Sequence, residues 1–178
     1  SWVYDFSQLL PPGVRCTVQV APGFRGPDGK ALRGKQSFAF LTGGPVVRQA
    51  IPSDGSTIEE NQYFLLRFNG AVAPESVKAH AHCAMDGLGE RIAVRLITGD
   101  EREQLVRARG WDHQGVPTDQ VVALACQRQL TPSAQVRLVL GKGVATPGGV
   151  ATSQAQQLGC TVREPFRVSF SCERENAQ

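Results

Sequence analysis

The residues best suited to chemistry in this sequence are two histidines and a cysteine in the stretch His80-Ala81-His82-Cys83. We predict a strand there, on which His80 and His82 share one face while Cys83 points to the core. Two histidines make an incomplete metal site, because zinc in proteins takes three or four protein ligands. A cysteine nucleophile needs a base within hydrogen-bond reach and an oxyanion hole, and no motif supplies either. We therefore expect neither a metal site nor catalytic residues here.

Two glycine-rich stretches, Gly141-Lys142-Gly143 and Pro147-Gly148-Gly149, are the places where a phosphate-binding loop could be sought. The phosphate-loop pattern G-x-x-x-x-G-K-[ST] is absent, and no helix is predicted to follow either stretch. The nucleophile pattern G-x-S-x-G is absent as well. Both stretches are predicted to be turns between strands, and we expect no cofactor and no enzymatic activity.

The charge and hydropathy of the chain exclude two classes of partner. The net charge is only +3, from 19 basic and 16 acidic residues, so nucleic acid is not a favoured partner. The longest apolar runs, such as Val121–Cys126, are far too short to cross a bilayer. No signal-peptide pattern opens the chain, and we expect that it is a piece cut from a longer protein.

Alternation of apolar and polar residues with a period of two dominates the sequence, in segments 14–20, 64–68, 92–96, 136–140 and 168–172. Such segments are typical of strands with one face on a core, and turn clusters rich in Gly, Pro and Asp separate them. Only Asp100–Arg109 is predicted to be helical, with a charged loop as the alternative. The predicted fold class is all-β, an Ig-like β-sandwich.

Among the five cysteines, Cys83 and Cys126 are the candidate disulfide pair. Alternation places Cys83 on the core face of its strand, and Cys126 shares a core face with Val122 and Leu124. Closing a loop of about 44 residues would stabilise the fold by roughly 4 kcal/mol in the chain-entropy model. The pairing of Cys16, Cys160 and Cys172 stays open, and the alternative is that all five are buried thiols.

A self-comparison shows that one part of the sequence resembles another at a constant offset. Segment 10–13 matches segment 130–133, and the same offset places Cys16, Val18 and Val20 on Val136, Leu138 and Leu140. We expect each copy to end in a Phe-bearing strand, 37–41 in the first and 167–172 in the second. The repeat predicts a serial array of sandwiches. Residues 1–43 would be the C-terminal strands of a truncated domain, and residues 44–178 a complete domain.

Several loose motifs, in this order along nearly the whole chain, resemble a known family. They are Leu41-Thr42-Gly43-Gly44-Pro45, the segment FNGAVAPESV at 68–77, the segment GERIAVRL at 89–96, Leu130-Thr131-Pro132 and the last Phe-bearing segment. Together they resemble the N-terminal Ig-like or macroglobulin-like domains of bacterial alpha-2-macroglobulin family proteins.

The resemblance implies a large periplasmic or envelope-attached protein, lipid-anchored in many members, that inhibits or traps proteases. Trapping in this family uses a bait segment and, in many members, a thioester with the motif C-x-E-Q. The sequences after Cys126 and Cys172 both fail that motif, and no long bait loop is evident. The expected role is a non-catalytic scaffold whose partners are neighbouring domains of the same chain, with proteases as targets of the parent protein. Membrane contact would come only through the parent's lipid anchor.

Two alternatives of other classes stay open at this point. The same pattern of repeated sandwiches builds modules of bacterial surface adhesins and surface-layer proteins, and it occurs in accessory binding domains of enzymes. A C-x-E-Q motif some hundreds of residues downstream would favour the protease trap. Further repeats leading to an anchor would favour the adhesin, and a catalytic domain in the parent would favour the accessory module.

Overall fold

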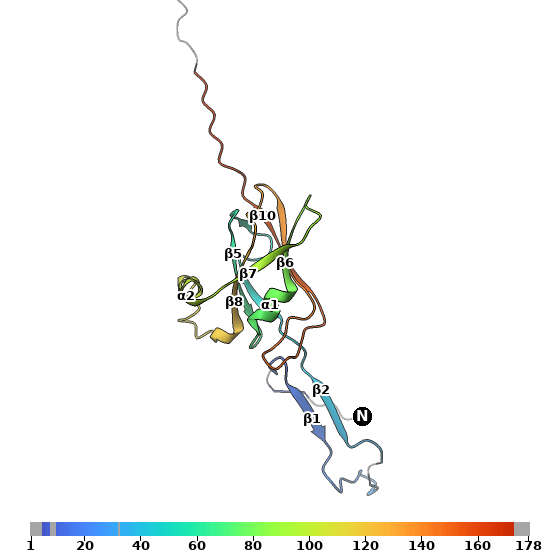
Figure 1. The fold of residues 1–178 in the computed structure, drawn as a ribbon. Coiled ribbons are helices and arrows are strands. Elements are labelled where there is room, and N and C mark those ends of the chain that lie inside the picture. The colour runs from blue at the N-terminus through green and yellow to red at the C-terminus, as the bar shows by residue number, and fades with distance from the viewer. Residues whose placement is uncertain (1–4, 8–9, 32, 173–178) are drawn as a thin grey trace, which may run out of the picture.

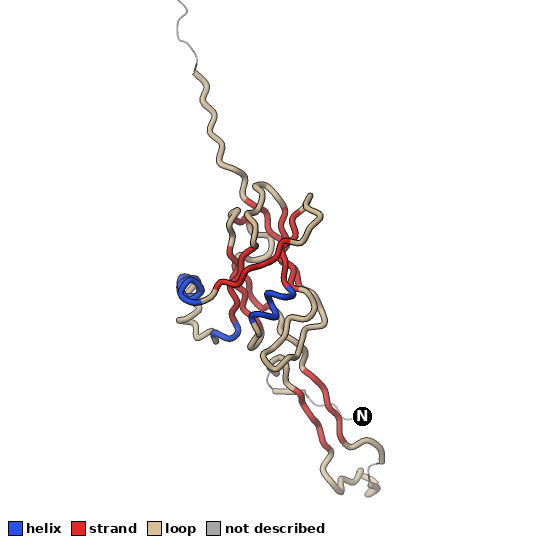
Figure 2. The backbone as a smooth tube through the Cα atoms, viewed as in Figure 1, coloured by secondary structure: helices blue, strands red, loops and turns tan. Residues whose placement is uncertain are grey.

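A computed structural model of the chain describes residues 5–7, 10–31 and 33–172. Three parts follow one another along the chain: a two-stranded hairpin, a β-sandwich and an extended C-terminal segment. The hairpin projects from one end of the sandwich, and the extended segment leaves from the opposite end (Figure 1). Figure 2 shows that strands and loops make up most of the described chain, with little helix.

The sandwich is built from eight strands in the hydrogen-bonded order β3-β5-β8-β7-β6-β9-β10-β4. Strands β6 and β7 share only two residue pairs, so the sheet folds over there into two layers. One layer holds β3, β5, β8 and β7, and the other holds β6, β9, β10 and β4. The strand bounds are β1 Arg15–Gln19, β2 Ser37–Leu41, β3 Val47–Ile51, β4 Thr57–Ile58, β5 Tyr63–Phe68, β6 Ala81–Met85, β7 Ile92–Ile97, β8 Val121–Cys126, β9 Gln135–Leu140 and β10 Gln156–Val162.

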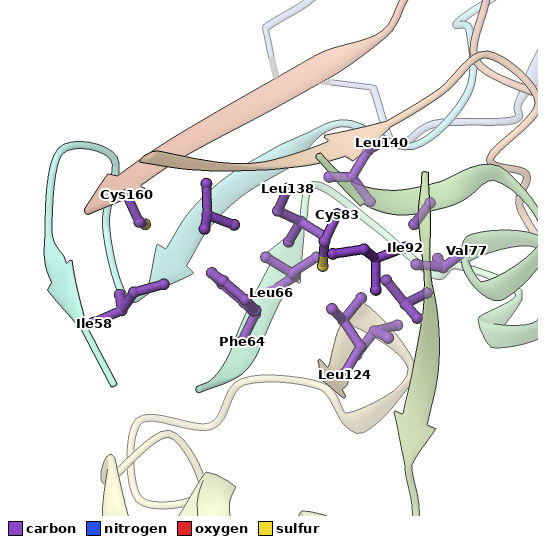
Figure 3. Close-up of a cluster of buried hydrophobic side chains, with 14 of the residues drawn as sticks. Ile58, Phe64, Leu66, Val77, Cys83, Ile92, Leu124, Leu138, Leu140 and Cys160 are labelled. Atoms are coloured by element: carbon purple, nitrogen blue, oxygen red, sulfur yellow. The ribbon is translucent and has the colours of Figure 1, made fainter. Parts of the chain in front are cut away.

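The space between the two layers is filled by apolar side chains, as the alternation of the sequence predicts. Phe64, Leu66 and Leu124 point inward from β5 and β8 and meet Leu138 and other side chains of the opposite layer (Figure 3). All four of these side chains are fully buried. Burying a Leu or Phe side chain contributes about 1.5–3 kcal/mol, so this core supplies the main driving force for folding. The predicted all-β sandwich is confirmed.

Two α-helices interrupt the strands, and the sequence predicts only one of them. Helix α2, Gly99–Ala108, occupies the segment expected to be helical. With Trp111 and Val116 it covers the outer face of β5 and β8 and forms a second, smaller core. Helix α1, Pro74–His80, was not predicted, although a proline in its first turn is a recognised helix-start signal.

A short 3₁₀ helix, Thr118–Gln120, precedes β8. Within the described chain, no helix is long and apolar enough to cross a membrane.

The N-terminal hairpin β1–β2 repeats the β9–β10 hairpin of the sandwich at an offset of 120 residues. The isolated bridge between Arg25 and Ala31 is matched by one between Ala145 and Ala151. The hydrogen bond from Gly26 N to Lys30 O is matched by one from Thr146 N to Val150 O. The offset found in the sequence therefore relates two hairpins of the same backbone structure.

The second copy does not end in the strand expected from the sequence. The offset places β2 on residues 157–161, which belong to β10. Residues 167–172, expected to be the Phe-bearing last strand, pair with no strand and are exposed. The strand β10 was missed because Gly159 and the glutamines in Gln156–Val162 weaken its alternation. The sandwich itself ends at Val162, so the segment after it adds no strand to the domain predicted to span residues 44–178.

Candidate functional site

The two cysteines that the sequence singles out are joined across the sandwich. Cys83 on β6 and Cys126 on β8 form a disulfide, with Cα atoms 6.0 Å apart and a sequence separation of 43. Cys83 is fully buried, and Cys126 packs against the same core. The bond links the two layers beside the fold-over between β6 and β7. Its role is structural, because a sulfur held in a disulfide is not available as a nucleophile.

The two histidines do not share a strand face, which corrects the sequence-based prediction. His80 is the last residue of α1 and is exposed, and the strand begins only at Ala81. The His80 ring lies directly against Gly143, where a side chain would have no room. His82 is half-buried on β6, and burial, with a smaller contribution from the Arg91 charge, lowers its pKa. Because α1 ends between them, the histidines do not form a pair that could hold a metal.

The remaining cysteines lie far apart in the fold. Cys160 is buried on β10, Cys16 is half-buried on β1 and Cys172 is exposed in the C-terminal segment. Burial, followed by the nearby Asp54 charge, raises the pKa of the Cys160 thiol. Over the described ranges, no group of three or more His, Cys, Asp or Glu side chains could hold a metal ion.

The hollows of the surface are shallow and open. One lies along the edge of the sandwich between β3 and β10 and is lined by Val47, Ala50, Leu140 and Leu158 among others. There the backbone N–H of Val47 donates to Oε1 of Gln156, 2.8 Å away, which joins the two layers at this edge. Arg48, Ser53 and Asp54 also line this hollow, and no group of three or more metal-ligating side chains lies there in the described residues.

The remaining candidate for a functional site is the joint between the hairpin and the sandwich. The ring of Pro12 lies against Gly70, and Gly44 lies against the backbone of Ala151 and Thr152. At both glycines a Cβ would overlap these neighbours, so the close approach requires glycine. Both Gly44 and the following Pro45 are buried. The joint is therefore a packed contact rather than a free linker.

Hydrogen bonds fix the base of the hairpin at this joint. The Thr42 hydroxyl donates to Pro11 O at 2.7 Å, and the backbone N–H of Val14 donates to the Thr42 oxygen at 2.9 Å. Gly13, at φ +75°, donates its N–H to Gly43 O and lies against the Thr146 side chain of the sandwich. The segments that enter and leave the hairpin are therefore hydrogen-bonded to each other, and they pack against the sandwich loop 143–152.

The hairpin presents apolar side chains that are only partly covered in the described chain. Val18 is 44% exposed, Phe38 50% and Phe40 40%. Phe6 contributes a tilted ring contact to Phe40, with the centroids 6.0 Å apart. In β9–β10 the equivalent positions, Leu138, Leu158 and Cys160, belong to the sandwich core. The hairpin thus carries the inner face of a sandwich without the opposite layer.

The joint residues were not predicted as a site from the sequence. The match between segments 10–13 and 130–133 contains Pro12 and Gly13, but it was interpreted only as a sign of a repeat. Gly70 and Gly44 lie inside the motifs that carry the family resemblance, and Gly44 is followed by a proline, Pro45. What the sequence could not indicate is which distant loops these glycines approach.

The sequence predicts that Arg91, Arg95, Arg137, Arg163 and Arg167 lie on outer strand faces as solvated surface, with pairing to Glu164, Glu173 and Glu175 or a domain contact as the alternative. Arg137 pairs with Asp86 at 3.2 Å and Arg163 with Glu59 at 3.0 Å. All of these ion pairs are exposed and contribute little stability. Glu173 and Glu175 lie outside the described residues.

Comparison with known proteins shows no family for this chain. No protein-family model and no curated protein match the sequence. Among solved structures, the N-terminal part of the bacterial S-layer protein SbsC matches 71% of this chain and 25% of its own, at 12% identity and a TM-score of 0.44. CopC from Methylosinus trichosporium OB3b matches 70% of this chain and 99% of its own, at 16% identity and a TM-score of 0.41. The chain corresponds to 14% of the six-domain SbsC structure.

Proposed function

We propose that this chain is a non-catalytic scaffold segment of a bacterial alpha-2-macroglobulin-like envelope protein that inhibits or traps proteases. The observation that carries the proposal is the packed joint between a repeated hairpin and a complete sandwich. Pro12 on Gly70 and Gly44 on the Ala151–Thr152 backbone fix the hairpin, which we take to end one sandwich unit, relative to the sandwich that follows. A protein that must hold several domains around a cavity needs joints of this kind, which resist bending.

The chemistry of the described residues supports a structural role over a reactive one. Cys83 and Cys126 are bonded to each other, and Cys160 is buried with a raised pKa, so none of the three is poised as a thiolate. The disulfide favours an oxidising compartment such as the periplasm or the cell envelope. The sequence motifs shared with the macroglobulin family supply the protease-inhibitor part of the proposal.

A protease-protection assay tests the scaffold role directly. The isolated chain, at an equimolar ratio to a trypsin-like or an elastase-like protease, is expected to leave cleavage of a large protein substrate unchanged. It is also expected to form no covalent adduct, because it lacks the C-x-E-Q thioester motif. Protection of the substrate, or an adduct on denaturing gels, would show that the segment itself inhibits and is not only a scaffold.

The parent gene separates this proposal from the adhesin alternative. We expect the coding sequence downstream of this segment to contain a C-x-E-Q motif and a bait region. An array of further sandwiches leading to a cell-surface anchor, without that motif, would assign the segment to a surface adhesin. A metal assay adds a check on the site chemistry: one zinc per chain, lost in the His80→Ala/His82→Ala variant, would contradict the non-catalytic role.

A further inference from the structure

The end of the sandwich opposite the hairpin carries a second copy of the joint surface. A hollow there is lined by Ser133, Glu164, Pro165 and Arg167. The 120-residue offset relates these four positions to Gly13, Gly44, Pro45 and Val47, which form the first joint and the start of β3. We call the surface formed by 131–133 and 163–167 the distal pole.

The backbone at the distal pole repeats the first joint as well as its sequence positions. Ser133 has a φ of +64°, close to the +75° of Gly13, although a left-handed conformation is uncommon for serine. The backbone N–H of Ser133 donates to Val162 O at 3.1 Å and also lies 3.4 Å from Arg163 O, the equivalent of Gly43 O, to which Gly13 donates. The backbone N–H of Val162 donates to Ala134 O, as that of Thr42 donates to Val14 O. The backbone conformation and hydrogen bonds at the base of the hairpin therefore recur at the distal pole.

The segment after the distal pole has the pattern of a strand but no partner in the described chain. Phe166 is 93% exposed, Val168 57% and Phe170 90%. These residues alternate with Arg167 and Ser169, which is the pattern of a strand with one apolar face. At the same distance from its own joint, the complete domain has β3, which pairs with β5. The offset relates Phe170 to Ala50, which packs against the core, Arg167 to the half-buried Val47 and Val168 to the exposed Arg48.

We propose that the distal pole is the docking surface for a further β-sandwich of this type, and that residues 166–170 form its first strand. Pro132 and Ser133 would contact that domain as Pro12 and Gly13 contact the loops at Gly70 and Thr146. The partner is a sandwich that continues the chain, not the sandwich of a second copy. In each copy the receiving loop at Gly70 is already occupied by that copy's own Pro12. This inference rests on the repeat and its joints and goes beyond the protease-related proposal.

Two substitutions within the repeat define the shape of the partner. Ser133 stands where the first joint has Gly13, and a Cβ at Gly13 would come within 2.8 Å of Thr146 Cγ2. Glu164 stands where the first joint has Gly44, whose Cβ would overlap the backbone of Ala151 and Thr152. The loop of the following sandwich must therefore stand farther from the pole than loop 143–152 stands from the hairpin. A test that uses this chain's own sandwich as the partner must remove both side chains.

The test is a tandem protein in which residue 171 of the full chain is joined to residue 52 of a second copy. It carries Ser133→Gly and Glu164→Gly in the first copy, and residues 166–171 take the places of residues 46–51, which include β3, in the second sandwich. Hydrogen exchange of the 166–170 amides is compared with that of the single 1–178 chain. We expect exchange at least about 100-fold slower in the tandem, because the strand becomes part of a folded sheet.

Two controls make the tandem decisive. A control tandem joins residue 163 to residue 44 of the second copy and carries Ser133→Gly, so the second sandwich keeps its own β3. Protection of that β3 alone, with 166–170 unprotected in the test tandem, would overturn the assignment of the strand. A second sandwich left unprotected in both tandems would overturn the docking surface. Protection of 166–170 in the single chain only at high concentration would assign the segment to a second copy, which also overturns the proposal.

A matched pair of substitutions tests which face of the segment is buried in the tandem. Phe170→Asp places a charge at the position equivalent to Ala50, which packs against the core in β3, and is expected to abolish the protection of 166–170. Ser169→Asp places the same charge on the opposite face and is expected to leave the protection within about threefold of the unsubstituted tandem. Equal effects of the two substitutions would contradict a strand with one buried face.

Discussion

The hairpins β1–β2 and β9–β10 have the same backbone structure and opposite surroundings. Val18 is 44% exposed where Leu138 is fully buried, and Phe40 is 40% exposed where Cys160 is 3% exposed. The turns, the isolated bridge and the left-handed residues nevertheless recur at the same positions. Local sequence is thus sufficient to specify the hairpin, whereas its burial depends on the layer that packs against it.

This difference predicts how stability is distributed along the chain. A two-stranded hairpin is at best marginally stable in water, so β1–β2 depends on the joint at Gly44 and Gly70. The β9–β10 hairpin is held by β6 on one side, by β4 on the other and by the opposite layer across the core. Substitutions at equivalent positions of the two hairpins are therefore expected to have unequal effects.

The largest expected effect comes from removing the disulfide, which lies in the sandwich alone. The Cys83→Ala/Cys126→Ala variant is expected to lose about 4 kcal/mol of unfolding free energy, since the bond closes a long loop in the unfolded chain. Urea unfolding followed by circular dichroism measures the loss. Cys16→Ala, which removes a free thiol from the hairpin, is the control and should change the value by less than about 0.5 kcal/mol.

Peptide mapping checks the bond itself. Free thiols are alkylated first, and the oxidised protein is then digested without reductant. We expect one peptide pair containing Cys83 and Cys126, and alkylated peptides for the other cysteines. Recovery of Cys83 and Cys126 as alkylated peptides would contradict the disulfide and weaken the assignment to an oxidising compartment.

The second prediction compares equivalent core positions in the two hairpins. Leu138→Ala removes a fully buried side chain and is expected to lower the unfolding free energy by about 3 kcal/mol. Val18→Ala, at the matching position of β1, is expected to change it by no more than about 0.5 kcal/mol, because Val18 is already half exposed. Similar losses at both positions, again from urea unfolding, would mean that the hairpin face is covered in solution.

The third prediction concerns the joint that the hairpin depends on. Gly44→Ala introduces a Cβ against the backbone of Ala151 and Thr152, and the resulting strain is expected to cost about 1–3 kcal/mol. Limited proteolysis should then release the hairpin faster while the sandwich stays intact. Gly89→Ala is the control, because a Cβ there meets no atom within 4 Å. Equal proteolysis of the two variants would show that the joint is not packed.

Much of the fold could be predicted from the sequence, because period-two alternation is a local signal. It identified β5, β7 and β9, and the repeat located the hairpin. The pairing of Cys83 with Cys126 was accessible because alternation places both side chains inward from strands of one domain. Helix α2 lies where the sequence predicts a helix, with a charged loop as the alternative, whereas α1 is too short to show a helical period.

The candidate site was less predictable, because it depends on contacts between distant segments. Nothing near Gly70 in the sequence indicates that Pro12 will lie against it, 58 residues away along the chain. The histidine pair failed for the opposite reason: a local pattern suggested a strand at His80, but the helix starting at Pro74 extends through that residue. Tertiary packing decided both cases.

The smallest expected effect is on the pH dependence of stability, and it arises in the sandwich at His82. Burial, and then the Arg91 charge, lowers the pKa of this imidazole in the folded state below that of the unfolded chain. The unfolded state therefore binds the proton more tightly than the folded state. Above its ordinary pKa of about 6.5, His82 leaves the free energy of unfolding unaffected. As the pH falls from there through the folded-state pKa, His82 lowers the free energy of unfolding. His82→Gln is expected to reduce the loss of unfolding free energy between pH 7 and pH 5, measured by urea unfolding at each pH. An unchanged profile in His82→Gln would mean that this histidine does not differ between the folded and unfolded states.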